Sequence, residues 1–289
     1  MSILKAEFVD LRDVHPFVKW AGGKGQLLSE LNKMIPRQFN TYFEPFLGGA
    51  AMFLHLASKN MIAIAYLSDT NEELIKAFKV VRDRVRELIK VLNQHQKEYD
   101  KNPSEYYYRL RDEIQPRNDV EIAARFITLN KTCFNGLYRV NQNGKFNVPM
   151  GEYKKPLICD GSNLKNVSSV LRHSNAEIQC VDYREMSLTP ETNDFVYLDP
   201  PYDPVSYTSD FTAYTPNGFG RENQEQLANL YRKLSDRGCF VLLSNSNTPF
   251  IRELYSHFRI KEVDVQRAIN CKGSKRADHK ELLISNYSV

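Results

Sequence analysis

Residues 195–202 read Phe-Val-Tyr-Leu-Asp-Pro-Pro-Tyr, an apolar run that ends in an acid, two prolines and an aromatic residue. A short apolar run bounded by turn residues is typical of a strand, and proline stops a strand because it has no N–H to donate. The sequence therefore predicts a strand over 195–198, with a group of polar and aromatic atoms where it ends.

The four residues after this strand, Asp199, Pro200, Pro201 and Tyr202, form a bracket suited to a flat ring that carries an amine. The prolines fix φ, and we expect their carbonyls to stay free to accept hydrogen bonds. The Asp199 carboxylate can accept another, and Tyr202 offers a π-face for stacking. Such a bracket would hold an amine by its two hydrogens with its lone pair pointing outward, as methyl transfer requires. The same tetrapeptide also occurs as a plain turn at a strand end.

Strand and helix patterns alternate at both ends of the chain, which favours an α/β fold with an open, largely parallel sheet. The middle is mostly helical, with Asn143-Gly144 as a hairpin signal. We therefore expect one domain built from residues 1–74 and 176–289, and an inserted helical domain over 75–175 that contains a β-hairpin. Strands are expected at 41–46, 62–67, 177–181, 195–198, 240–244, 259–265 and 281–287, and helices at 72–92, 103–112, 120–129, 221–234 and 249–258.

Composition narrows the class of protein. The chain has 289 residues, 42% of them hydrophobic, and a net charge of +4, which permits a nucleic-acid partner without demanding one. Its five cysteines form no C-x-x-C pair and its six histidines no H-x-x-x-H pair, so neither a disulfide framework nor a metal site is expected. No apolar stretch is long enough to span a bilayer, and the N-terminus does not resemble a signal peptide. We expect a soluble protein of a reducing cytoplasm.

Two glycine-containing segments are candidates for a nucleoside site. Residues 43–51 read Phe-Glu-Pro-Phe-Leu-Gly-Gly-Ala-Ala, a strand-to-helix turn without the glycine spacing or basic residue of a phosphate site. Asp69 follows about 20 residues on, where an acid binds ribose hydroxyls in doubly wound folds, although an acid there also suits a helix N-terminus. Residues 20–24 read Trp-Ala-Gly-Gly-Lys. The next residue, Gly25, stands where a P-loop has Ser or Thr. Trp20 and Lys24 could contact a nucleoside or amino acid, or lie in a plain glycine-rich turn.

Two segments concentrate basic residues. Residues 131–155 hold Lys131, Arg139, Lys145, Lys154 and Lys155 against one acid, and 270–280 hold Lys272, Lys275, Arg276 and Lys280 against one acid. Basic runs are usually just solvated, but their concentration in two loops of a weakly charged protein favours phosphate contacts. The first segment also carries Asn and Arg, the side chains that read adenine and guanine.

The order of these motifs, including Asn-Gly-Leu-Tyr-Arg at 135–139 and Phe-Asn-Val-Pro at 146–149, resembles the Dam-like DNA adenine-N6 methyltransferases. That family includes DpnM-like modification methylases of type II restriction systems that act at GATC. The resemblance covers nearly the whole chain, from about residue 16 to residue 287. It implies a Rossmann-like domain that uses S-adenosylmethionine, with the insert as target-recognition domain. Two positions depart from relatives: Glu152 stands where a basic residue is common, and Phe134 where some have Tyr.

The resemblance also implies roles for individual residues. The catalytic bracket would be Asp199, Pro200, Pro201 and Tyr202. The cofactor would contact Trp20, Ala21, Lys24, Phe46, Gly48, Asp69 and Asp199. DNA would contact Phe134, Asn135, Leu137, Arg139, Asn141, Asn147, Pro149, Tyr153, Lys272, Lys275 and Arg276.

The implied substrate is double-stranded DNA containing GATC, with no membrane partner and with a cognate restriction endonuclease as a genetic partner. Two alternatives stay open from the residues: methylation of an amine in RNA or protein, and a catalytically silent DNA-binding relative. The sequence does not distinguish a restriction system from a solitary or phage role.

Overall fold

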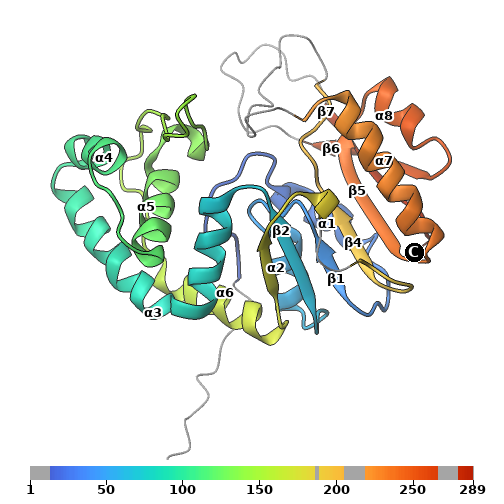
Figure 1. Ribbon diagram of the computed structural model, residues 1–289, viewed down its shortest axis with the longest axis horizontal. Coiled ribbons are helices and arrows are strands. Elements are labelled where there is room, and N and C mark those ends of the chain that lie inside the picture. The colour runs from blue at the N-terminus through green and yellow to red at the C-terminus, as the bar shows by residue number, and fades with distance from the viewer. Residues whose placement is uncertain (1–13, 186–188, 205–218, 266–278, 289) are drawn as a thin grey trace, which may run out of the picture.

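The computed structural model describes residues 14–185, 189–204, 219–265 and 279–288, and its centre is a seven-stranded sheet (Figure 1). The strand order is β3-β2-β1-β4-β5-β7-β6. The strands are β1 Tyr42–Glu44, β2 Ala65–Asp69, β3 Glu177–Cys180, β4 Phe195–Leu198, β5 Phe240–Ser246, β6 Arg259–Val265 and β7 His279–Ser285.

Strands β3, β2, β1, β4 and β5 pair in parallel, whereas β7 is antiparallel to both β5 and β6. This confirms the predicted α/β fold with a largely parallel sheet. The strands predicted at 195–198 and 259–265 have the predicted bounds. Strand β2 starts three residues later than predicted, because its register with β1 begins at the pair Tyr42 and Ala65.

Helices cover both faces of the sheet, so successive side chains of a strand point into two different apolar clusters. Phe195 and Tyr197 belong to one cluster, with side chains of α1 Leu28–Asn32, α2 Ala51–Ser58, α3 Glu72–Lys101 and α6 Gly161–His173. Val196 and Leu198 belong to the other, with α7 Arg221–Asp236 and α8 Pro249–Leu254. A strand buried on both faces reads as a continuous apolar run, as 195–198 does.

The helical insert lies beside the sheet, built around α3, α4 Pro103–Asp112 and α5 Asp119–Thr132 (Figure 1). Asparagine side chains cap all three helices by accepting from the backbone N–H of N3, at Asn71, Asn102 and Asn118. Helix α3 runs well beyond the predicted residue 92, with non-helical backbone at Arg84. It is therefore continuous across residues 74 and 75, and the division of the chain into two domains stays a proposal.

The hairpin expected in the insert is reduced to one antiparallel bridge between Val140 and Phe146. The turn itself forms, since Asn141 N–H donates to the Lys145 carbonyl and Gly144 N–H to the Asn141 carbonyl. Beyond the bridge, Asn147 N–H donates to the Arg139 carbonyl at 3.1 Å, so one more backbone hydrogen bond joins the two sides.

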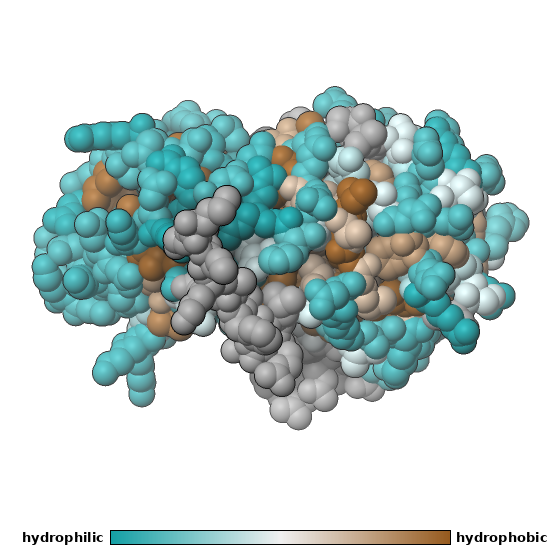
Figure 2. All heavy atoms as spheres, turned by 90° about the horizontal axis from the view of Figure 1, so that it is seen from below, coloured by the Kyte–Doolittle hydropathy of each residue, from teal (hydrophilic) through white to brown (hydrophobic). Residues whose placement is uncertain are grey.

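The surface of the insert is mainly hydrophilic on the face drawn in Figure 2, and apolar residues appear there singly or in small groups. Among the described residues, no helix is both long and apolar enough to cross a membrane.

Candidate functional site

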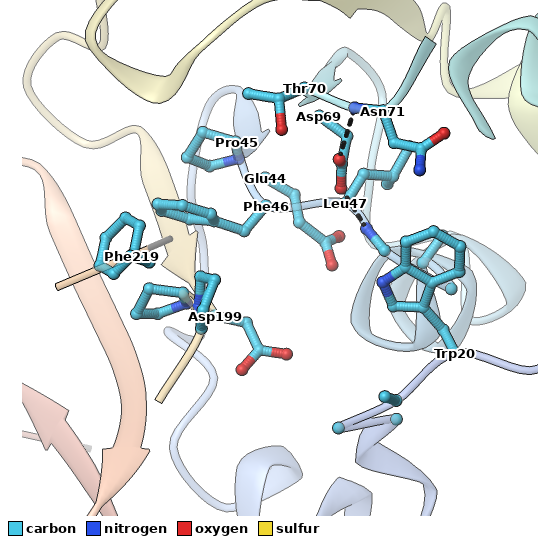
Figure 3. Close-up of a pocket in the computed structure, with 18 of the residues that line it drawn as sticks. Trp20, Glu44, Pro45, Phe46, Leu47, Asp69, Thr70, Asn71, Asp199 and Phe219 are labelled. Carbon is cyan, nitrogen blue, oxygen red and sulfur yellow. Dashed lines mark hydrogen bonds between the residues drawn. The ribbon is translucent and has the colours of Figure 1, made fainter. Parts of the chain in front are cut away.

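The candidate site lies where β1 ends between β2 and β4. Parallel strands on either side of β1 lead to helices on opposite faces, and ligands bind at such a switch point, outside the carboxyl ends of the strands. Glu44 ends β1, Asp69 ends β2, and Asp199 follows β4. All three line a cavity of about 1330 Å³, into which the Asp199 and Glu44 carboxyl groups both point (Figure 3).

Asp199 is held through one of its two oxygens. Lys24 Nζ lies 2.7 Å from Oδ1, and the Ser244 hydroxyl donates to the same atom at 2.8 Å. Within the described part of the chain no group donates to Oδ2. Burial raises the pKa of the Asp199 carboxyl, and the Lys24 ammonium and the Ser244 hydroxyl oppose that rise. The result is an oriented carboxylate with one oxygen neutralised and the other available to a ligand.

The two proline carbonyls differ in their use. The Pro201 carbonyl accepts a hydrogen bond of 2.9 Å from the Gln224 amide, so the expectation that both carbonyls stay free is wrong for Pro201. No described residue donates to the Pro200 carbonyl. Tyr202 is fixed at its far end, where its hydroxyl donates to Glu281 at 2.8 Å, and the Lys24 ammonium lies 4.8 Å from its ring centroid.

A buried polar network supports the bracket from behind. The Asn245 amide donates to Gln224, and the Asn245 carbonyl oxygen accepts from the backbone N–H of Asp203. Hydroxyls of Ser246 and Thr248 donate to the Asp203 carbonyl and carboxylate. Such networks fix one arrangement when every member is satisfied. Asp203 directly follows the bracket. The other residues, together with Ser244 and Glu281, come from β5, α7, β7 and the start of α8 and share no motif with the bracket, so sequence reasoning missed them.

The glycine turn after β1 packs against Trp20. Gly48 has a φ of +47°, and a Cβ there would lie 2.7 Å from Trp20 Cδ1, so only glycine suits this position. Its N–H donates to Asp69 Oδ2 at 2.9 Å, while Asp69 Oδ1 accepts from Asn71 N–H at 3.0 Å. The Asp69 carboxylate keeps lone pairs for a further donor, since each of its oxygens can accept more than one hydrogen bond. Burial raises the pKa of Asp69, and the three backbone N–H groups that it accepts from oppose that rise.

Glu44 is a buried acid near Asp199. Nothing in the sequence indicated that the pKa of Glu44 is shifted. Its Oε2 accepts from the Tyr42 hydroxyl at 2.8 Å and from Phe53 N–H at 3.1 Å. Burial raises the pKa of Glu44 to about 8, with the Asp199 charge adding to the rise. Glu44 is therefore mainly protonated at neutral pH.

Successive parts of the cavity lining suit successive parts of S-adenosylmethionine: the adenine, the ribose and the sulfonium. Phe46 lies at one end, with its ring centroid 5.1 Å from that of Tyr183 and 5.8 Å from that of Phe219, which offers apolar faces to an adenine ring. Asp69, predicted to accept from ribose hydroxyls, lies next, and the acid-rich floor around Asp199 suits a cationic sulfonium. Trp20 forms the wall opposite Phe46 (Figure 3). Ala21 lines the cavity and is exposed.

The residues predicted to contact DNA in the insert lie together on one loop system. Phe134, Asn135, Arg139, Asn141 and Pro149 are exposed, and the first of them is 46% exposed although it is aromatic. Arg139 Nε donates to the Asn147 side chain at 2.7 Å, which orients the guanidinium. The Asn141 side-chain oxygen Oδ1 accepts from the backbone N–H groups of Asn143 and Lys145 in its own turn. Leu137 and Asn147 are half-buried.

Tyr153 contacts Lys19, a residue that sequence reasoning missed. Lys19 Nζ lies 3.6 Å from the Tyr153 ring centroid, and its backbone is clamped by the Asn130 amide, which accepts from Lys19 N–H and donates to the Lys19 carbonyl. The signal available in the sequence was its place directly before Trp20. The predicted DNA contacts Lys272, Lys275 and Arg276 lie outside the described residues. Within the described residues no cluster of three His, Cys, Asp or Glu side chains could hold a metal ion.

Comparison with known proteins agrees with this geometry. Residues 20–269 match the family described as D12 class N6 adenine-specific DNA methyltransferase. The chain is 45% identical over 290 residues to the Type II methyltransferase M.MjaIII of Methanocaldococcus jannaschii, covering 95% of this chain and 100% of the relative. It is 39% identical to the Type II methyltransferase M1.LlaDCHI of Lactococcus lactis subsp. cremoris, covering 99% of each, and 35% identical to the DNA adenine methylase of Escherichia coli, covering 92% and 93%. The chain belongs to the D12 class of adenine-N6 DNA methyltransferases, which use S-adenosylmethionine as methyl donor.

Proposed function

We propose that this D12-class enzyme methylates the N6 amine of adenine within GATC in double-stranded DNA, using the bracket Asp199, Pro200, Pro201 and Tyr202. One observation carries the assignment of the bracket: Asp199 Oδ2 and the Pro200 carbonyl are acceptors to which no described residue donates, and they stand on consecutive residues at the edge of the cavity. Two acceptors match the two hydrogens of an exocyclic amine.

The bracket would act on a base taken out of the duplex. An enzyme cannot reach N6 of a paired adenine, so the nucleotide is extruded at a cost of a few kcal/mol. The Tyr202 ring would stack on the extruded base, which is worth roughly 1–3 kcal/mol in comparable contacts. The hydrogen bond to Glu281 holds that ring in place before the base arrives.

Catalysis would come mainly from alignment. Asp199 Oδ2 and the Pro200 carbonyl accept the amine hydrogens, which moves the nitrogen toward tetrahedral geometry and turns its lone pair to the cavity. Bound S-adenosylmethionine supplies an activated methyl group on a sulfonium, so no covalent enzyme intermediate is needed. The Lys24 ammonium opposes the rise in the pKa of the buried Asp199 carboxyl and leaves Oδ2 unobstructed.

Recognition of GATC rests on the insert. Arg139 is exposed and oriented by Asn147, as a side chain that reads the O6 and N7 atoms of guanine must be. Phe134, Asn135, Leu137 and Pro149 would contact neighbouring base pairs. The resemblance to Dam-like enzymes supports this sequence, and the relative named a DNA adenine methylase is consistent with it.

A role in a restriction system is favoured over a solitary one. The two relatives named Type II methyltransferases match 95% and 99% of this chain. Methylation would then protect host sites against a cognate endonuclease, which is a genetic partner and needs no contact surface here. The enzyme would act in the cytoplasm on the nucleoid DNA.

The test is transfer of a labelled methyl group from S-adenosylmethionine to two duplexes that differ only in GATC versus GTAC. Label in GATC alone, recovered as N6-methyladenine, is the expected result. Equal labelling of both duplexes would overturn the GATC assignment. No label in either, with the cofactor bound, would point to an RNA or protein amine instead.

The Asp199→Ala variant tests the bracket. We expect turnover to be abolished and DNA binding, measured by fluorescence anisotropy, to be largely retained. Asp83→Ala, which removes an exposed carboxylate paired with Arg82, is the matched control and should keep full activity. Methylation by Asp199→Ala at near wild-type rate would contradict the mechanism.

A further inference from the structure

One wall of the cavity comes from the DNA-reading loop itself. Tyr138, Val140 and Gly144 belong to the insert, yet they line the same cavity as Asp69 and Asp199. Tyr138 stands directly between Leu137 and Arg139, both proposed to contact DNA. A movement of this loop therefore changes the shape of the cavity, unless Tyr138 is held independently of its neighbours.

Tyr138 is held from the cavity side. Its ring stacks on the Trp20 indole with centroids 6.1 Å apart and planes 27° apart. Its hydroxyl donates to Glu73 Oε2 at 2.8 Å, and the other Glu73 oxygen faces Arg125 at 3.6 Å. The desolvation of the hydroxyl and the nearby Glu73 charge raise the pKa of Tyr138, so the phenol remains a donor over the working pH range.

Trp20 carries the contact on to the turn after β1. The indole lies against Gly48, close enough that a Cβ there would collide with it. Gly48 N–H in turn donates to Asp69, the proposed acceptor for the cofactor ribose. A continuous line of direct contacts therefore runs from Arg139 through Tyr138, Trp20 and Gly48 to Asp69.

We propose that Tyr138 is a positioning residue that couples cofactor binding to DNA binding through its stack on Trp20. A cofactor held between Phe46 and Asp69 fixes the Gly48 turn and Trp20. The fixed indole holds Tyr138, and Tyr138 holds the backbone of Leu137 and Arg139 in the arrangement that meets DNA. This inference rests on the proposed function, because it takes residues 134–139 to contact DNA.

Coupling of this kind is reciprocal. If the cofactor raises the affinity for DNA by some factor, DNA raises the affinity for the cofactor by the same factor. The two sites need not touch, since each biases the position of the shared Trp20–Tyr138 pair. The enzyme would therefore engage its site most tightly when it carries the methyl donor.

Trp20 offers a direct readout, because the chain has one tryptophan. We would titrate the full chain with a GATC duplex and follow both anisotropy of labelled DNA and emission of Trp20, without cofactor and with saturating S-adenosylhomocysteine. In the wild type we expect DNA to change Trp20 emission even without cofactor. We also expect S-adenosylhomocysteine to tighten DNA binding by a factor in the usual range for coupled sites, about 5- to 150-fold.

Three variants separate the contacts. Tyr138→Leu removes both the stack and the hydroxyl, and should bring the coupling factor close to 1 while DNA still binds. Tyr138→Phe keeps the stack and should keep most of the coupling; it also serves if Tyr138→Leu fails to fold. Tyr106→Phe is the matched control, since it removes a buried tyrosine hydroxyl of the insert that pairs with His95 and does not line the cavity, and it should behave as wild type.

The outcomes distinguish this proposal from the proposed function. DNA binding without any change in wild-type Trp20 emission, or an unchanged coupling factor in Tyr138→Leu, would overturn the coupling even if GATC is methylated. A coupled response to a duplex that is never methylated would keep the coupling and overturn the proposed function. A wild type that binds neither GATC nor GTAC duplex would overturn both.

Discussion

Replacing Lys24 with methionine should shift the pH dependence of methyl transfer, because the Lys24 ammonium is what opposes the burial of Asp199 most strongly. The two side chains are 5% and 20% exposed, and their nitrogen and oxygen atoms lie 2.7 Å apart. Methionine keeps most of the lysine volume and removes the charge. Ser244 would remain as the only described donor to the Asp199 carboxylate.

The size of the effect follows from the distance and the burial. At an effective dielectric constant of about 20, two unit charges 2.7 Å apart attract by about 6 kcal/mol before any relaxation. Water and Ser244 recover part of this, and carboxyl groups beside one cation usually have a pKa lowered by about 1–3. The pKa of Asp199 already lies above its ordinary value with Lys24 present. Lys24→Met should therefore raise the acid limb of the rate profile by about 1–3 pH units, or roughly 1.4–4 kcal/mol.

The appropriate measurement is kcat/KM for a GATC duplex between about pH 5 and pH 9, because that ratio reports the pKa values of the free enzyme, in which the pair forms. The variant should be most impaired at low pH and should recover toward alkaline pH, where Asp199 ionises without help. Lys24→Arg should stay close to wild type because it keeps the charge. Lys33→Met is the matched control, since it breaks an exposed pair with Glu30 and neither residue lines the cavity.

An unchanged acid limb in Lys24→Met would refute this reasoning. A loss of equal size at every pH, accompanied by a higher KM for S-adenosylmethionine, would show that Lys24 acts on the cofactor, as its motif also predicts. A loss confined to DNA binding would show that the Lys24 ammonium contacts a DNA phosphate.

Three further predictions concern single side chains. Glu44→Gln should flatten the pH dependence of stability. The pKa of Glu44 is about 8 in the folded state and 4.5 in the unfolded chain, so the wild type loses stability as the pH rises between these two values. Urea unfolding should show that this loss is roughly 3–5 kcal/mol larger in the wild type than in the variant. Tyr202→Phe should keep most of the activity, whereas Tyr202→Ala should cost about 1–3 kcal/mol in kcat/KM, and equal losses in the two would deny the stacking role. Arg139→Ala should cost about 1–3 kcal/mol of discrimination at one guanine, measured as kcat/KM on singly substituted sites; equal losses on specific and random DNA would identify a phosphate contact.

The sequence predicted elements best where local signals and tertiary packing agree. Residues 195–198 form a strand with the predicted bounds because they are apolar on both faces and proline follows. Helix α4 begins at Pro103, as predicted, because proline suits the first turn and Asn102 caps it. Helix α6 was missed: its interior is rich in Ser and Asn, and its stability comes from buried Leu164 and Val167 packing on neighbours.

The site was predicted only in part, for a similar reason. Acids at strand ends could be found, because topology brings the carboxyl ends of parallel strands together. The supporting groups could not, since Ser244, Gln224 and Glu281 lie far along the chain from Asp199 and become neighbours only in the folded sheet. The same holds for the stack of Tyr138 on Trp20, which joins residues from the two parts of the chain.

The charge state of the cavity offers a reason for this combination of acids. Glu44 is protonated at neutral pH, while Asp69 accepts from backbone N–H groups and Asp199 pairs with Lys24. Three acids and one ammonium therefore lie around the floor, and this acid-rich lining favours a cationic ligand. Loss of the methyl group removes the sulfonium charge, so the same carboxylates hold the product less tightly. Burial keeps the Glu44 carboxyl mainly protonated at neutral pH, so the preference for the charged form rests on Asp69 and Asp199.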